Sequence, residues 1–172
     1  MDKLFLFDAY ALIYRSYYAF IKNPRINSKG LNTSAVMGFC NTLHEVLTKE
    51  KPTYLGVAFD PHGPTFRTEV YAEYKAQREE TPEDIRRAVP IIKSLLKAMR
   101  IPVLEADGYE ADDVIGTLAL KAGAEGVMTY MLTPDKDYGQ LVRENVMMYR
   151  PRHGGGYETL DAEKACAKNG IA

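Results

Sequence analysis

Acidic residues stand at four separate places in this chain, each directly after an apolar run or at the start of a helical pattern. Carboxylate oxygens are the ligands that Mg²⁺ takes in proteins, and two such ions can activate a water and clamp a phosphodiester during hydrolysis. One acid at a helix start is more often a cap, but the joint pattern favours a metal site. The acids are Asp8, Asp60, the group Glu110, Asp112 and Asp113, and the pair Asp135 and Asp137.

Alternating strands and helices must position these acids. Apolar runs predict strands at 4–7, 54–59, 102–104 and 127–132, and apolar periodicity predicts helices at 10–20, 33–49, 83–100 and 110–123. Two more strands flank a glycine run and predict a hairpin over 146–160. This order is typical of an α/β fold with a mostly parallel central sheet and helices on both faces.

The carboxyl ends of parallel strands share one edge of a sheet, where such folds bind ligands, so we expect the acids to meet there. Carboxylates brought close together repel one another unless protons or cations neutralise them. No His or Lys follows the predicted strands in a way that would pair with all of the acids. Divalent cations would neutralise them, because Mg²⁺ needs few carboxylates per ion.

The overall composition is ordinary for a globular chain of 172 residues, with 46% hydrophobic and 26% charged residues. The 22 Lys and Arg nearly balance the 23 Asp and Glu, so the net charge of −1 excludes a bulk polycation and a disordered acidic tail. Cys40 and Cys166 are too few for a disulfide framework. We find no signal peptide and no membrane span, and expect a cytoplasmic protein without membrane partners.

Five blocks of residues carry a family resemblance. In order and spacing they resemble the 5′-nuclease domain at the N-terminus of bacterial DNA polymerase I, a member of the flap endonuclease family. The resemblance covers essentially the whole chain, and the blocks at 110–116 and 135–137 are the most specific. The blocks are Phe7-Asp8-Ala9-Tyr10 with Tyr14-Arg15, Ala58-Phe59-Asp60, Phe66-Arg67 with Tyr74-Lys75 and Arg78, Glu110-Ala111-Asp112-Asp113-Val114-Ile115-Gly116, and Asp135-Lys136-Asp137.

The resemblance implies a PIN-like, resolvase-like catalytic domain over 1–172, with a helical arch or mobile segment at about 61–82. It implies 5′-3′ exonuclease and flap endonuclease activity on DNA with 5′ flaps or ends, during replication and repair. Two divalent ions, Mg²⁺ or Mn²⁺, would serve this reaction without a small-molecule cofactor. Polymerase domains in the same longer chain would be its partners, at the nucleoid in the cytoplasm.

The resemblance also assigns roles to the acids. Asp8, Asp60, Glu110 and Asp112 would hold the first ion. Asp135 and Asp137 would hold the second ion, with Asp113 shared between the two or placed behind them.

Basic and aromatic side chains are assigned to the DNA by the same resemblance. Lys75 and Arg78 would stabilise charge on the scissile phosphate from the arch, and Tyr14 would stack on the terminal base. Arg15 and Arg67 are plausible phosphate contacts, with a structural ion pair as the alternative. A further cluster of Arg86, Arg87, Lys93, Lys97 and Arg100 is either a nucleic-acid-facing stripe or a solvated helix face.

The sequence departs from the family pattern at three positions and at its end. Ala9, Ser34 and Pro134 stand where glycines are usual, and Pro134 stiffens the backbone beside two proposed ligands. The family continues with further metal aspartates and a helix–turn–helix element, whereas the sequence stops at Ala172. We therefore expect an N-terminal fragment that binds the second metal weakly and cleaves poorly.

Three other functions fit the acids less well. A PIN-domain ribonuclease has similar acids but is usually shorter and lacks the basic arch. A receiver-like signalling module would use Asp60 as phosphoacceptor, but it has an acid pair after its first strand, where Ala9 follows Asp8 here. A sugar-phosphatase-type site fails for the same reason, because the second acid of its Asp-x-Asp pair is missing.

Overall fold

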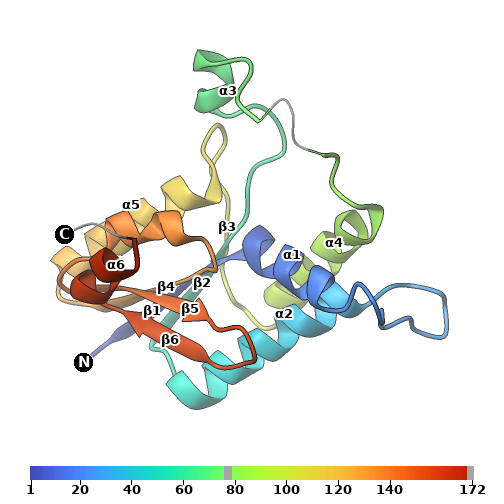
Figure 1. Ribbon diagram of the computed structural model, residues 1–172, viewed down its shortest axis with the longest axis horizontal. Helices are drawn as coiled ribbons and strands as arrows, with labels where there is room; N and C mark the ends of the chain where they lie inside the picture. The colour runs from blue at the N-terminus through green and yellow to red at the C-terminus, as the bar shows by residue number, and fades with distance from the viewer. Residues whose placement is uncertain (76–78, 170–172) are drawn as a thin grey trace.

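A six-stranded sheet in the order β3-β2-β1-β4-β5-β6 forms the centre of the protein (Figure 1). The computed structural model describes residues 1–75 and 79–169. All strand pairs are parallel except β5 with β6, which confirms the predicted mostly parallel α/β sheet. The strands are β1 (Lys3–Asp8), β2 (Tyr54–Ala58), β3 (Val103–Leu104), β4 (Met128–Leu132), β5 (Val146–Pro151) and β6 (Tyr157–Leu160).

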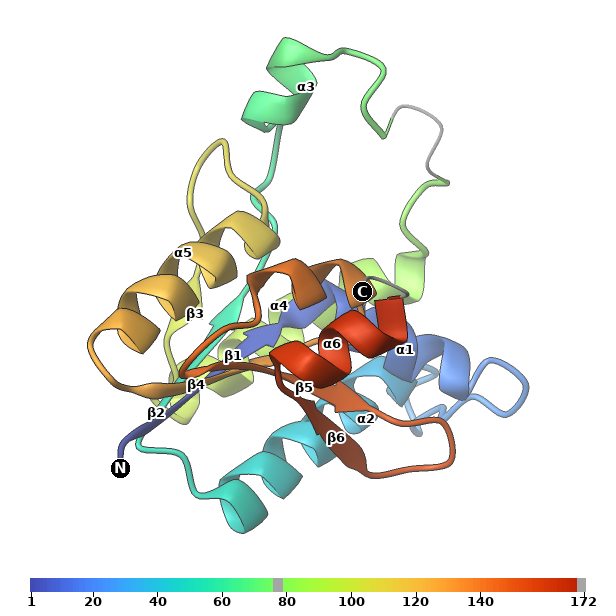
Figure 2. The ribbon, with the colours of Figure 1, turned by 60° about the vertical axis from the view of Figure 1, so that its left-hand side comes forward.

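Helices cover both faces of this sheet (Figures 1 and 2). The helices α1, α2 and α4 pack together on one face, and α5 packs on β1, β2 and β4 on the other. The bounds of the helices are α1 (Ala9–Ala19), α2 (Ser34–Glu45), α3 (Phe66–Val70), α4 (Glu83–Ala98), α5 (Ala111–Ala124) and α6 (Ala162–Asn169).

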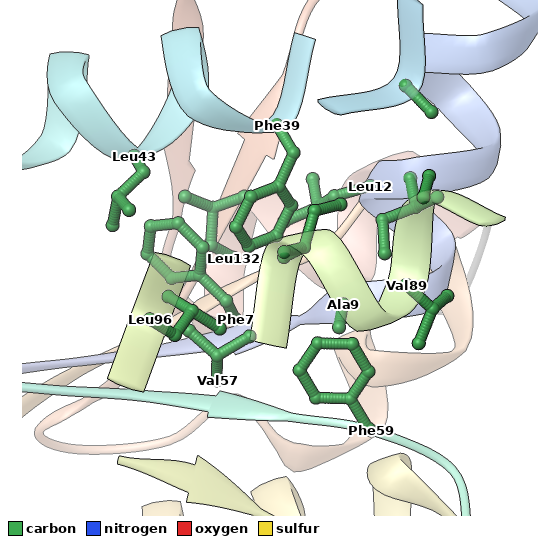
Figure 3. Close-up of a cluster of buried hydrophobic side chains, with 14 of the residues drawn as sticks. Phe7, Ala9, Leu12, Phe39, Leu43, Val57, Phe59, Val89, Leu96 and Leu132 are labelled. Atoms are coloured by element: carbon green, nitrogen blue, oxygen red, sulfur yellow. The ribbon is translucent and has the colours of Figure 1, made fainter. Parts of the chain in front are cut away.

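Alternation along β1 divides the core into two layers. Phe5 and Phe7 point to the face that α1, α2 and α4 cover, and Leu6 points to the α5 face. Successive side chains of a strand point to opposite faces, so a short apolar run serves both layers. Figure 3 shows the first layer, where Phe7 and Phe39 pack among aliphatic side chains. This central strand is therefore anchored on both sides, directly before Asp8.

The register brings the carboxyl ends of the central strands level. Asp8 pairs with Ala58 of β2, and Phe7 pairs with Leu132 of β4. The residues that follow β1, β2 and β4 therefore emerge at one edge of the sheet, as predicted. The α5 helix begins at the same edge. There the Asp60 carboxylate accepts a hydrogen bond from the backbone N–H of Ala111 (2.8 Å).

Three local features differ from the sequence expectation. The helix α2 ends at Glu45 and continues as a π-helical turn over Val46–Glu50, closed by Lys51 at φ 48°. A 3₁₀ helix over Lys136–Leu141, which the apolar pattern does not show, follows β4. The N-cap position of α4 is Pro82, whose side chain has no hydrogen-bonding group, although the preceding Thr81 is of a type that commonly caps helices.

The segment 61–82, which we call the arch, leaves the body between β2 and α4. Figure 2 shows α3, which belongs to this segment, at the top of the view and away from the sheet. Among its described residues, α3 with five residues is the only α-helix in this segment, for which the family resemblance implies a helical arch or a mobile segment. Tyr71 is extended (φ −139°, ψ 97°) and ends the helix. Arg78 itself lies outside the described residues.

None of the helices in the described part of the chain is both long enough and apolar enough to cross a membrane.

The close approach of α1 and α2 depends on Gly38. A Cβ atom placed on Gly38 would lie 2.4 Å from Cβ of Ser16 and 3.3 Å from its Cα, so the two helices would have to separate. We expect Gly38→Ala to lower the free energy of unfolding by about 1–3 kcal/mol, the usual cost of overpacking a core. Urea denaturation followed by circular dichroism measures this change. A stabilised variant, as helix propensity alone would give, would contradict the packing argument.

Candidate active site at the carboxyl edge of the sheet

A cavity of about 760 Å³ opens at the carboxyl edge, beneath the arch. Five of the predicted ligands line it from four separate segments: Asp8, Asp60, Glu110, Asp112 and Asp135. Asp8 ends β1, Asp60 follows β2, Glu110 and Asp112 open α5, and Asp135 follows β4. The parallel register therefore gathers into one cavity acids that lie far apart in the sequence.

Asp8 is the most enclosed carboxylate at this edge after Glu110, with 8% of its surface exposed. Its carboxylate accepts hydrogen bonds from the Thr133 hydroxyl (3.0 Å) and from the backbone N–H of Ala11 (3.4 Å). Burial raises the pKa of Asp8 from 3.8 to about 6, and the nearby charge of Asp60 adds to the rise. The side chain is thus a buried acid whose charged form lacks full compensation.

Glu110 is 7% exposed and is held by the arch. The Lys75 ammonium lies 2.6 Å from its Oε1, and the Tyr74 hydroxyl donates to its Oε2 (3.2 Å). Lys75 has a positive φ of 60°, a left-handed conformation that is uncommon for a lysine. The ion pair helps to hold that turn of the arch over the cavity.

Arg67 binds another acid of the α5 N-terminus, Asp113. Its guanidinium donates two hydrogen bonds to the carboxylate, at 2.6 and 2.7 Å, and lies 3.9 Å from Asp112. The guanidinium lowers the pKa of Asp113, whereas burial and the charge of Asp113 raise the pKa of Asp112. Asp113 also accepts from the backbone N–H of Glu110 (3.1 Å), so it caps α5 while it anchors the arch.

Two predicted ligands lie outside this cavity. Asp113 and Asp137 line an adjoining cavity of about 300 Å³, which shares Asp112 and Asp135 with the first. Among residues 1–75 and 79–169, no three His, Cys, Asp or Glu side chains are grouped tightly enough to hold an ion as they stand. Five of the seven expected carboxylates therefore share one cavity, while Arg67 and Lys75 form ion pairs with Asp113 and Glu110.

Two predicted DNA contacts are engaged elsewhere. Arg15 lies away from the cavity and donates to the backbone carbonyl of Arg152, at the tip of the β5–β6 hairpin (3.0 Å). Arg67 forms the structural ion pair that the sequence left as the alternative. Tyr14 does line the cavity, and its hydroxyl bonds to the Thr81 hydroxyl across the base of the arch (3.1 Å).

Tyr138 is a site residue that the sequence reasoning missed. It is 3% exposed, lines both cavities, and its buried hydroxyl interacts with the Asp8 carboxylate. Burial and the charge of Asp8 raise its pKa, so it stays a neutral donor. Its position directly after the predicted ligand Asp137 is the one sequence feature that could have indicated a place in the site. The 3₁₀ helix, which no periodicity revealed, turns the ring inward.

The chain matches a family model described as the 5′-3′ exonuclease N-terminal, resolvase-like domain, over residues 3–170. It is 40% identical to a 5′-3′ exonuclease of Aquifex aeolicus over 171 residues, which cover 99% of this chain and 57% of that protein. It is also 40% identical to the DNA polymerase I of Geobacillus stearothermophilus over 172 residues, which cover 99% of this chain and 19% of the polymerase.

Solved structures share the fold at low sequence identity. The T5 D15 protein co-crystallised with metal ions superposes with a TM-score of 0.69 and 16% identity, covering 99% of this chain and 62% of that one. The catalytic core of Rad2 in complex with a DNA substrate gives a TM-score of 0.56 and 20% identity, covering 99% and 51%. At such identities the likeness concerns the fold alone.

The raised pKa of Asp8 makes a prediction for the metal-free protein. The fold favours the neutral form of Asp8. The stabilisation of the folded protein from this preference is complete below pH 3.8 and is lost as the pH rises through 6. We expect the stability of Asp8→Asn relative to that of the natural protein to be about 2–2.5 kcal/mol greater at pH 8 than at pH 4. Urea denaturation in EDTA at both pH values measures this difference. A difference that does not change with pH would contradict the burial argument.

Proposed function

The chain belongs to the family of 5′-3′ exonuclease N-terminal, resolvase-like domains, and from this we propose that it hydrolyses phosphodiester bonds near 5′ ends of DNA with divalent metal ions. The observation that carries the proposal is a cavity lined by seven carboxylates, five of them predicted ligands, beneath an arch that supplies the cations Arg67 and Lys75. Such a combination suits a polyanionic substrate, because acids alone would repel it.

The relatives are longer proteins. The chain spans 57% of the Aquifex exonuclease and 15% to 19% of the first polymerases it matches. We propose that polymerase domains follow it in one longer chain, that it acts on flapped or recessed 5′ ends in replication and repair, and that it works in the cytoplasm at the nucleoid.

The donor set suits hard divalent cations. Asp8, Asp60, Glu110, Asp112 and Asp135 would hold a first ion, because hard cations take carboxylate oxygens and ordered waters. The buried Tyr138 hydroxyl lies beside Asp8 and adds a polar group to the wall of this cavity.

We place the second ion between the two cavities, where Asp112 and Asp135 belong to both and Asp113 and Asp137 line only the second. When bound, Mg²⁺ or Mn²⁺ would activate a water and stabilise charge on the scissile phosphate.

Side chains of the arch and of α1 position the substrate in this proposal. Lys75 forms an ion pair with Glu110. When a metal ion binds the Glu110 carboxylate, the Lys75 ammonium would be free to contact the scissile phosphate. Tyr14 offers an aromatic face to a terminal base at the cavity wall. Arg78 stays a proposed phosphate contact outside the described residues. Arg67 positions the arch through its ion pair with Asp113. Arg15 donates a hydrogen bond to the backbone carbonyl of Arg152 in the hairpin, so we do not propose it as a contact of the scissile phosphate.

Cleavage of DNA with a 5′ single-stranded flap tests the activity. We expect slow cleavage that requires Mg²⁺ or Mn²⁺, stops in EDTA and falls at least about 100-fold in Asp60→Asn, the scale of losing one catalytic group. Asp2→Asn is the matched control, because Asp2 precedes β1 at the opposite edge of the sheet. Preference for single-stranded RNA would instead favour the PIN-type ribonuclease, and metal-independent cleavage would refute the proposal.

The Lys75–Glu110 pair makes a second test possible. Because Lys75 occupies a proposed ligand, we expect Lys75→Gln to bind Mn²⁺ about threefold to tenfold more tightly while its cleavage rate falls at least about tenfold. Calorimetric titration with Mn²⁺ and single-turnover cleavage measure the two effects. Lys49→Gln serves as control, since Lys49 pairs with Glu45 on an exposed helix. Weaker metal binding in Lys75→Gln would contradict the competition.

A further inference from the structure

Thr133 is a fully buried polar residue that lies between two of the acids. It directly follows β4 and is 0% exposed. Its hydroxyl lies 3.0 Å from Oδ2 of Asp8 and 3.1 Å from the backbone nitrogen of Asp135. Both of these residues line the cavity of about 760 Å³. One hydroxyl therefore contacts an acid at the end of β1 and the backbone of another acid that follows β4.

The chemistry of the groups fixes the direction of these two hydrogen bonds. A backbone N–H can only donate, so the Thr133 oxygen accepts from Asp135. A hydroxyl has one proton and an ionised carboxylate has none, so Thr133 donates its proton to Asp8. The other oxygen of Asp8 accepts from the backbone N–H of Ala11 (3.4 Å). Each oxygen of the Asp8 carboxylate is thus held by a donor from a different element, which fixes the plane of the group.

Pro134 stands inside the turn that Thr133 closes. A threonine oxygen that accepts from the N–H two residues later forms an ST turn. Proline fixes its own φ near −65° and has no N–H. The turn uses the N–H of Asp135, so the proline ring removes no hydrogen bond from it. The departure from the glycine that is usual in the family therefore stiffens the backbone between Thr133 and Asp135.

The hydrogen bonds continue along the chain to a third acid. Asp135 caps the 3₁₀ helix, because its Oδ1 accepts from the backbone N–H of Asp137 (3.0 Å). Asp137 therefore donates to Asp135, Asp135 donates to Thr133, and Thr133 donates to Asp8. The strands β1 and β4 pair side by side, and this series crosses from one to the other where both end. The placement of Asp8 relative to the turn that carries Asp135 and Asp137 thus depends on one hydroxyl.

A second buried threonine shows that burial on β4 does not by itself give this arrangement. Thr129 is also 0% exposed, but it lies near the other end of the strand. Its hydroxyl donates to the backbone carbonyl of Val127, two residues earlier (3.1 Å). The Thr129 hydroxyl satisfies a local backbone group, whereas the Thr133 hydroxyl joins two segments that lie far apart in the sequence.

We propose that Thr133 is a positioning residue for the metal site, whose hydroxyl holds Asp8 and the turn of Asp135 in the relative placement that lets one divalent ion bind both. The inference rests on the proposed nuclease function and deepens it, since both acids are assigned to the first ion. Mg²⁺ demands near-ideal geometry of its oxygen ligands, and hydrogen bonds to ligating carboxylates orient them. Loss of the hydroxyl therefore weakens metal binding and slows cleavage without unfolding the sheet.

Two substitutions at Thr133 separate its hydroxyl from its methyl group. Thr133→Val keeps the shape and removes the hydroxyl, whereas Thr133→Ser keeps the hydroxyl and removes the methyl group. We expect Thr133→Val to bind Mn²⁺ at least about tenfold more weakly, and to cleave flapped DNA at least about tenfold more slowly at saturating Mn²⁺, the scale of losing a partner of a metal ligand. Thr133→Ser should remain close to the natural chain in both. Calorimetric titration and single-turnover cleavage by the 172-residue chain measure the two effects.

A residue that only packs the core would reverse the order of the two variants. Valine would fill the space and keep the metal affinity, whereas the missing methyl group of Thr133→Ser would lower the urea midpoint. Thr129→Val is the matched control, because it makes the same change in the same strand and should leave Mn²⁺ affinity and cleavage unchanged. Urea denaturation in EDTA checks that each variant is folded. If Thr133→Val does not fold, Thr133→Ala against Thr133→Ser again compares chains that differ by the hydroxyl.

The outcomes distinguish the positioning role from the nuclease function. Natural Mn²⁺ affinity in Thr133→Val, an equal loss in Thr133→Ser, or the same loss in Thr129→Val would overturn the positioning role. If Mn²⁺ binding depends on the Thr133 hydroxyl while the natural chain cleaves no DNA, the nuclease function fails and the positioning role stands. If the natural chain cleaves DNA and Thr133→Val equals it in both affinity and rate, the positioning role alone fails.

Discussion

Electrostatic repulsion among carboxylates is the constraint on which the arrangement of this protein depends. Parallel strands β1, β2 and β4 end at one edge, and each is followed by an acid that the register brings toward the others. The protein compensates this charge with hydrogen bonds from Thr133 and backbone N–H groups, and with two cations from the arch. The arch is thus held over the cavity by the charges it would cover during catalysis.

The two cations that hold the arch differ in chemistry. Arg67 makes a two-point contact with Asp113 and lies 3.5 Å from Oε2 of Glu110, so its release would cost two strong charge-assisted hydrogen bonds. Lys75 makes a single contact with Glu110 through a flexible side chain and lies in a left-handed backbone conformation. A divalent ion that competes for Glu110 would therefore release the Lys75 end and leave the Arg67 end in place.

The sequence predicted those features that depend on periodicity and on strand order. The sheet, the helices on both faces and the common edge for Asp8, Asp60, Glu110, Asp112 and Asp135 all follow from apolar runs that end in acids. The partners of Arg67 and Lys75 could not be predicted, because ion pairs across 35 to 46 residues depend on how the arch folds back. Tyr138 was missed for a similar reason, since a short 3₁₀ helix leaves no apolar period.

The basic cluster of α4 shows how geometry resolves an ambiguity of the sequence. Five cations without an acid fit a solvated face as well as a binding stripe, and in the structure their surroundings differ. Arg87 lies on a solvated side with Glu83, whereas Arg86 and Lys93 face a cavity that shares walls with the carboxylates. Opposite charges therefore line two adjoining cavities, the predicted metal ligands in one and Arg86 with Lys93 in the other. A chain with a net charge near zero can bind a polyanion in this way, because its positive and negative side chains are equally numerous but lie in different places.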